Sequence, residues 1–113
     1  MQKLGQHFLK DGSVLRAIAE AVEPRDGETI IEIGPGHGEL TAELVSSCQL
    51  LGSREKPCHI VAIEKDVRLI ESLRKKFIAA TDVEIIEGDA LRILPVITNN
   101  YQLKTKNYVI IGN

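Results

Sequence analysis

The stretch Thr29-Ile-Ile-Glu-Ile-Gly-Pro-Gly-His-Gly38 decides the fold. Its first half is a short β-branched run, which is typical of a buried strand. Its second half spaces glycines as G-x-G-x-G, and a glycine lets the backbone turn sharply and come close to a ligand because no Cβ intervenes. The spacing differs from G-x-G-x-x-G, which sets a helix N-terminus against a pyrophosphate. A tight turn without a ligand is the other interpretation of these glycines.

Strand and helix patterns alternate along the rest of the chain. We expect strands at 29–33, 60–63, 83–86 and 108–111. We expect helices that begin near Asp11 or Ser13, after Gly38 and at Asp66, and a short helical stretch at 91–97. This alternation indicates a parallel sheet with helices on both faces. The predicted fold class is therefore α/β and Rossmann-like, with the strand order 3-2-1-4 of half a doubly wound sheet.

The fourth expected strand, 108–111, is apolar on both sides, as a central strand is. In the order 3-2-1-4 it would be a bare edge, which proteins avoid. We therefore expect residues 1–113 to be the N-terminal part of a larger domain, with the strands that cover 108–111 outside this sequence.

Composition narrows the class of protein. A length of 113 residues indicates one domain at most, and the 43% hydrophobic content is ordinary for a globular chain. The formal net charge of −2 counts against strong nucleic-acid binding unless basic residues cluster locally. No apolar run approaches the roughly 20 residues of a membrane span, and the N-terminus has no apolar signal-peptide core. We expect a cytoplasmic protein with no membrane partner.

Cys48 and Cys58 form no C-x-x-C pair, and His59 adds too few ligands for a zinc site. We therefore expect no metal and two free thiols in a reducing compartment. Residues 48–57 are interpreted as a polar loop inserted between a helix and a strand.

Three acids are candidate binding groups. Glu32 lies within a buried strand, where a carboxylate is costly unless it is paired, so we expect it to meet the amino-acid portion of a ligand. Glu64 ends the second strand, where Rossmann-type sites place an acid on ribose hydroxyls; a solvated Glu is the alternative. Asp89 follows the third strand and can accept the amino group of adenine or cap the next helix, and the spacing leaves both open.

These acids all lie at the carboxyl ends of parallel strands, where open α/β sheets bind ligands. No Walker lysine follows the glycines, so a nucleoside triphosphate is not expected. Two further segments are weaker signals. Gly112-Asn113 alone is interpreted as a turn, and His7-Phe8-Leu9 alone is interpreted as a hydrophobic staple before the first helix.

Together these motifs resemble the ribosomal RNA adenine dimethyltransferase family. The resemblance rests on Leu4-Gly-Gln-His-Phe-Leu-Lys-Asp11, Glu32-Ile-Gly-Pro-Gly-His-Gly38, Ile63-Glu64, Gly88-Asp89-Ala90 and Gly112-Asn113, which come in the family's order across essentially the whole chain. The Gln-His-Phe-Leu segment is the specific part, and related erythromycin-resistance methyltransferases share it. Pro35 is more similar to the housekeeping small-subunit enzymes.

The resemblance implies S-adenosyl-L-methionine as the cofactor. It places His7 and Leu9 along the cofactor, Gly34 and Gly36 in the turn under the methionine part, Glu64 on the ribose, Asp89 on the adenine, and Asn113 at the methyl group as the catalytic residue. The implied reaction is dimethylation of the exocyclic amine of adenines in small-subunit ribosomal RNA. The implied partner is ribosomal RNA of the small-subunit precursor, bound with the help of a C-terminal helical domain, and we expect the full-length protein to be a monomer.

Other functions stay open because a fold alone does not decide function. A methyltransferase of the same fold with another substrate is one, although the Gln-His-Phe-Leu segment argues against it. A non-catalytic ribosome-assembly or RNA-binding factor is another, favoured by the acidic charge balance. A nicotinamide-dependent oxidoreductase is disfavoured by the glycine spacing.

Overall fold

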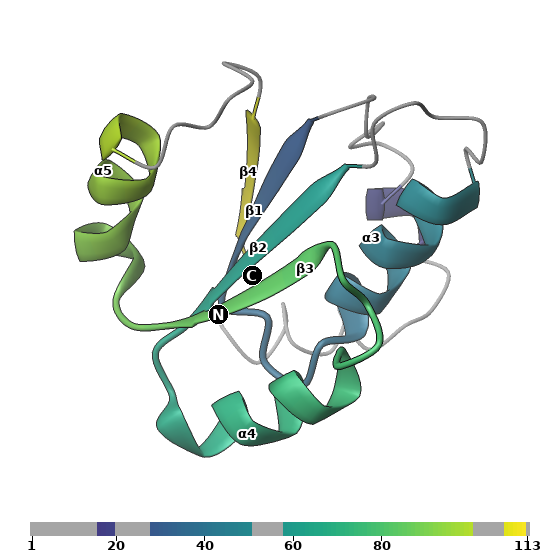
Figure 1. Cartoon of the computed structure of the whole chain (residues 1–113), viewed down its shortest axis with the longest axis horizontal. Coiled ribbons are helices and arrows are strands. Elements are labelled where there is room, and N and C mark those ends of the chain that lie inside the picture. The colour runs from purple at the N-terminus through teal and green to yellow at the C-terminus, as the bar shows by residue number, and fades with distance from the viewer. Residues whose placement is uncertain (1–15, 20–27, 51–57, 101–107, 113) are drawn as a thin grey trace.

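The computed structural model describes residues 16–19, 28–50, 58–100 and 108–112 (Figure 1). Residues 16–19 are helical. The other elements are β1 Thr29–Ile33, α3 Glu39–Leu50, β2 His59–Glu64, α4 Val67–Lys76, β3 Val83–Glu87, α5 Ala90–Asn100 and β4 Tyr108–Gly112. Strands alternate with helices along these ranges, as the sequence predicts.

The strands form one parallel sheet in the order β3-β2-β1-β4, which confirms the predicted order 3-2-1-4. β1 lies between β2 and β4, so Glu32 has Ala62 on one side and Ile111 on the other. Figure 1 shows α3 and α5 on opposite faces of the sheet, with α4 beside β3. β1 is therefore covered on both faces and both edges, which explains why its apolar run has no polar alternation.

An apolar cluster packs on each face of the sheet. One contains Ala19, Ile30, Leu40, Leu44 and Ile60, and the other contains Ile31, Val61, Ile63 and Ile97. Successive side chains of a strand point to opposite faces. Ile30 therefore packs under α3 and Ile31 under α5. By the same alternation Glu32 lies on the α3 face.

Two helices are longer than predicted, and β2, β3 and β4 extend by one residue at one or both ends. α3 continues to Leu50, so Cys48 belongs to the helix and not to the loop. α5 covers Ala90–Asn100, which is longer than the predicted 91–97, and Pro95 lies inside it. A proline cannot donate a hydrogen bond to the carbonyl four residues earlier, here that of Leu91. Leu91 is 83% exposed, so water can reach that turn of the helix.

Cys48 and Cys58 are joined by a disulfide, with their Cα atoms 6.0 Å apart. The expectation of two free thiols is therefore wrong for this structure. α3 packs against β2, so the last turn of the helix comes close to the start of the strand. The sequence spacing alone does not show this proximity, because it depends on how far α3 continues.

β4 pairs with β1, and no described strand lies along its other side. Ile110 is 47% exposed, whereas Val109 and Ile111 are partly buried. The apolar fourth strand is thus at the edge of the described sheet. Among the described helices, none combines the length and apolar character needed to cross a membrane.

Candidate functional site

The turn between β1 and α3 depends on glycines with positive φ. Gly34, Gly36 and Gly38 have φ values of 68°, 62° and 88°, a region that is strained for residues with a Cβ. A Cβ on Gly38 would lie 2.8 Å from the Phe77 ring, so this glycine lets α4 pack against the turn. A Cβ on Gly36 would meet nothing within 4 Å, so the middle of the turn borders open space.

Backbone hydrogen bonds join the turns that follow β1, β2 and β3. The Gly34 amide donates to the Ile63 carbonyl at 2.8 Å, and the Gly88 amide donates to the Glu64 carbonyl at 2.9 Å. The three segments that the sequence predicted as ligand-binding turns are therefore held together at one end of the sheet.

Glu64 is anchored in this arrangement and is only 7% exposed. Its Oε1 accepts from the Gly36 amide at 3.0 Å, and its Oε2 accepts from the Asp66 amide at 2.9 Å. The structure contradicts the alternative of a solvated side chain at a strand end. Each carboxylate oxygen has two lone pairs, so both can still accept from ligand hydroxyls.

Glu32 is fully buried beside the same turn. Its Oε1 accepts from the Thr41 hydroxyl, and its Oε2 has no hydrogen-bond partner among the described residues. Burial raises the pKa of Glu32 to about 7, the Thr41 hydrogen bond opposes that rise, and the charges of Glu39 and Glu64 add to it. A buried acceptor left unpaired is costly, so a donor from a bound ligand would stabilise this group.

Sequence reasoning did not single out Thr41. The signal was a hydroxyl residue in the first turn of the helix that follows the glycines. This position faces β1 once α3 packs on the sheet, but the sequence alone does not say which strand residue it meets.

Asp89 caps α5. Its Oδ1 accepts from the Leu91 amide at 3.0 Å, and its side chain is exposed. The capping interpretation is confirmed, while the contact with adenine stays a prediction. Asp66 caps α4 in the same way, as its position predicted.

His7, Leu9 and Asn113 lie outside the described residues, so their predicted roles stay predictions. Within the described ranges, no group of three or more His, Cys, Asp or Glu side chains is placed to hold a metal ion.

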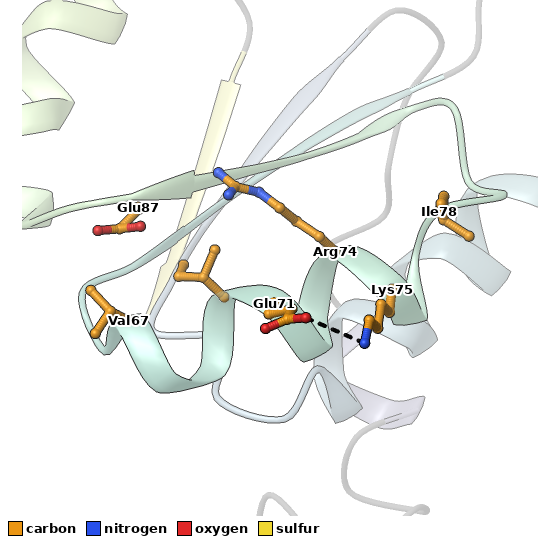
Figure 2. Close-up of a pocket in the computed structure, with 7 residues that line it drawn as sticks. Val67, Glu71, Arg74, Lys75, Ile78 and Glu87 are labelled. Atoms are coloured by element: carbon orange, nitrogen blue, oxygen red, sulfur yellow. Dashed lines mark ion pairs between the residues drawn. The ribbon is translucent and has the colours of Figure 1, made fainter.

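A groove of about 470 Å³ lies between α4 and β3, and no residue of the glycine turn lines it (Figure 2). Its lining residues are Val67, Ile70, Glu71, Arg74, Lys75, Ile78 and Glu87. Glu71 and Lys75 pair with each other at 3.3 Å, and the Arg74 guanidinium donates to the Ile85 carbonyl at 3.3 Å. These charged groups already bind one another or a strand carbonyl. The groove is therefore a weaker candidate for a binding site than the end of the sheet with its buried acids.

The chain matches a family model described as ribosomal RNA adenine dimethylase over residues 1–113. It is similar to ribosomal RNA small subunit methyltransferase A of Deinococcus radiodurans, with 48% identity over 90 residues. That alignment covers 80% of this chain and 27% of the relative. The chain spans between 27% and 32% of the length of eight curated relatives that it matches.

Two solved structures place the fold. A 23S rRNA methyltransferase, ErmE, has a TM-score of 0.61 and 33% identity, over 74% of this chain and 31% of that one. A dimethyladenosine transferase from Plasmodium falciparum has a TM-score of 0.58 and 25% identity, over 73% of this chain and 27% of that one. These likenesses confirm the predicted Rossmann-like methyltransferase fold. With a family model matched from the first residue to the last, the chain belongs to the ribosomal RNA adenine dimethylase family.

Proposed function

We propose that the protein dimethylates the exocyclic amine of adenines in small-subunit ribosomal RNA, using S-adenosyl-L-methionine, and that residues 1–113 supply the cofactor site. The observation that carries the proposal is the pair of buried carboxylates, Glu32 and Glu64, beside the glycine turn. The family match supports adenine in ribosomal RNA as the target, and the name of the Deinococcus radiodurans relative supports the small subunit.

The hydrogen-bond donors of S-adenosyl-L-methionine match the hydrogen-bond acceptors of the site. The methionine part carries an ammonium group, which fits the Glu32 oxygen that has no partner among the described residues. The ribose carries two hydroxyls, which fit the lone pairs that remain on Glu64. In a nicotinamide dinucleotide site Glu64 would also meet ribose hydroxyls, but a pyrophosphate at the glycine turn would lie beside the buried acid Glu32, which offers it no matching charge.

When bound, the cofactor supplies an electrophilic methyl group on a sulfonium sulfur. The adenine amine is a poor nucleophile, so alignment of the two groups is the main task of the protein. We propose that the Asn113 carbonyl accepts from the amine and directs its lone pair toward the methyl group. The base must leave its stack to reach this position.

The acidic net charge of the chain does not oppose an RNA partner, because positive charge is concentrated locally. α4 carries the exposed cations Arg68, Arg74, Lys75 and Lys76. Asp66 pairs with Arg68 and Glu71 pairs with Lys75, which leaves an excess of two positive charges on this helix. Ribosomal RNA as substrate also suits a protein that acts in the cytoplasm.

We also propose that residues 1–113 belong to a larger methyltransferase domain with further strands beside β4. The half-exposed, apolar Ile110 and the unpaired side of β4 in the described sheet support this. A strand paired with the free side of β4 would satisfy its backbone groups and cover Ile110.

Calorimetric titration of the full-length protein with S-adenosyl-L-methionine tests the cofactor, with NAD as the control ligand and Glu64→Ala as the control variant. We expect selective binding that the variant loses. Binding of NAD instead, or no binding by folded protein, would contradict the assignment. Transfer of labelled methyl groups to small-subunit ribosomal RNA, compared with protein and small-molecule acceptors, then tests the substrate.

A further inference from the structure

Thr41 is a buried hydroxyl residue in the first turn of α3. Its Oγ1 donates a hydrogen bond to Oε1 of Glu32, across the interface between the helix and β1. A hydroxyl that donates to a carboxylate stabilises the charged form of that carboxylate. Thr41 is therefore placed to act on the cofactor site through Glu32 without lining it.

The surroundings of Glu32 otherwise favour its neutral form. Burial is the largest effect, and the charges of Glu39 on α3 and Glu64 on β2 act in the same direction. Its neighbours across the sheet, Ala62 and Ile111, are uncharged. On helix 16–19, which packs on the same face through Ile18 and Ala19, the Arg16 side chain is exposed.

We propose that Thr41 is a positioning residue of the cofactor site: its hydroxyl favours the ionised form of Glu32 and leaves the second carboxylate oxygen to accept from the cofactor's ammonium group. This inference rests on the proposed function. A protonated Glu32 would lose its charge attraction for an ammonium group. The Thr41 hydrogen bond thereby sets the lower end of the pH range in which the cofactor binds.

Binding of the cofactor is then linked to release of a proton near neutral pH. Below the Glu32 pKa of about 7 in the free protein, affinity should rise about tenfold per pH unit. The ammonium group of the ligand, with an ordinary pKa of about 8, limits affinity on the alkaline side. In a plot of cofactor affinity against pH, titration of Glu32 thus determines the acid limb and titration of the ligand's ammonium group determines the alkaline limb.

The experiment uses the full-length protein with Thr41→Val, which keeps the shape and removes the hydroxyl, and Thr41→Ser, which keeps the hydroxyl. Affinity for S-adenosyl-L-methionine is measured by calorimetry from about pH 6 to about pH 9. Carbon-13 NMR of the Glu32 carboxyl follows its titration in the free protein. For the wild type, calorimetry in two buffers of different ionisation enthalpy counts the protons released at neutral pH, and this needs no variant.

We expect Thr41→Val to move the acid limb upward by about one pH unit, because the variant loses a hydrogen bond that favours the charged form of the Glu32 carboxyl. Affinity on that limb then falls about tenfold, the alkaline limb stays in place, and the carboxyl titrates higher. Thr41→Ser restores the wild-type profile.

Equal weakening at every pH, an unchanged profile, or a Ser variant that behaves like Val would overturn the role of Thr41. Wild-type binding without proton release would overturn the linkage and leave the proposed function standing. Absence of wild-type binding at any pH would overturn both.

Discussion

At the scale of single residues, the site combines a buried acid with a helix hydroxyl and glycines of positive φ. Glu32 is the residue whose chemistry depends most on the fold, because burial moves its pKa from 4.5 to about 7. In an unfolded chain nothing would hold that value. The protonation of this one carboxyl is therefore coupled to folding.

Glu32→Gln should change how stability depends on pH. Between about pH 4.5 and about pH 7 the folded wild type holds a proton that the unfolded chain has lost, so its free energy of unfolding falls as pH rises, by roughly 3 kcal/mol at most. Glutamine does not titrate, so the free energy of unfolding of the variant should not show this fall. Relative to the wild type, the variant should therefore be more stable at pH 8 than at pH 4.5. Urea unfolding at both ends of the range measures the difference. Parallel pH profiles for the two proteins would show that Glu32 keeps an ordinary pKa.

Gly36→Ala and Gly38→Ala form a matched pair of turn variants. Both place a Cβ at positive φ, which costs about 1–2 kcal/mol. Only Gly38→Ala also drives the Cβ against Phe77, which adds roughly 1–3 kcal/mol. We expect Gly38→Ala to lower the free energy of unfolding more, and Gly36→Ala to lower cofactor affinity more. Urea unfolding and calorimetry separate the two effects, and the reverse ranking would contradict the geometry.

Asn113→Ala in the full-length protein should abolish methyl transfer and spare cofactor binding. The reason is that the amide is proposed to hold the target amine and not the cofactor. Single-turnover transfer to ribosomal RNA and calorimetry with S-adenosyl-L-methionine measure the two properties. A parallel loss of cofactor affinity would show that Asn113 belongs to the cofactor site instead.

At the scale of elements, the sequence predicts what depends on local pattern. β1 is recognisable because its β-branched run is bounded by a glycine turn, and α4 because Asp66 caps an apolar stripe that ends at Phe77. The sequence predicts that Glu64, the last residue of β2, and the glycine turn after β1 lie at the same end of the sheet, because parallel strands end on the same side. Their roles in binding stay predictions.

Other features depend on packing between elements, which spacing does not reveal. Thr41 meets Glu32 only because α3 lies across β1, and Cys48 meets Cys58 only because α3 continues one turn further than its polar end suggests. The competition at Asp89 between a cap and a ligand contact could not be resolved from sequence, because both roles use the same carboxylate at the same position.

The outer edge of β3 yields a prediction at this scale. β3 pairs with β2 on one side, and on the sheet edge the Arg74 guanidinium donates to the Ile85 carbonyl. A charged side chain over an edge opposes pairing with another chain. Arg74→Met should therefore increase self-association while stability changes by about 1 kcal/mol at most.

Lys75→Met is the control for that variant. It removes the same charge from the same helix, but Lys75 pairs with the exposed Glu71 and leaves the strand edge covered. Sedimentation velocity across a concentration series compares the two proteins. Equal self-association would attribute the effect to charge alone.

At the scale of the whole molecule, the exposed positive charges are separated from the buried acids of the candidate site. The buried acids lie among the strand ends, whereas the cations of α4 lie on the outside beside β3. The chain therefore contains a basic helix although its net charge is −2. For this chain the overall charge was a poor guide to its family, and the order of its motifs was a good one.

The order β3-β2-β1-β4 also has a consequence for synthesis on the ribosome. Among the described strands β1 is made first and its partner β4 last, yet β1 becomes an inner strand of the sheet. The edge of β1 that pairs with β4 therefore keeps unpaired backbone groups, beside apolar side chains, until nearly all the described chain has been translated. Parallel pairing of distant segments is slow and prone to aggregation. The nascent protein thus has a period of vulnerability whose length is set by the rate of elongation from β2 to β4.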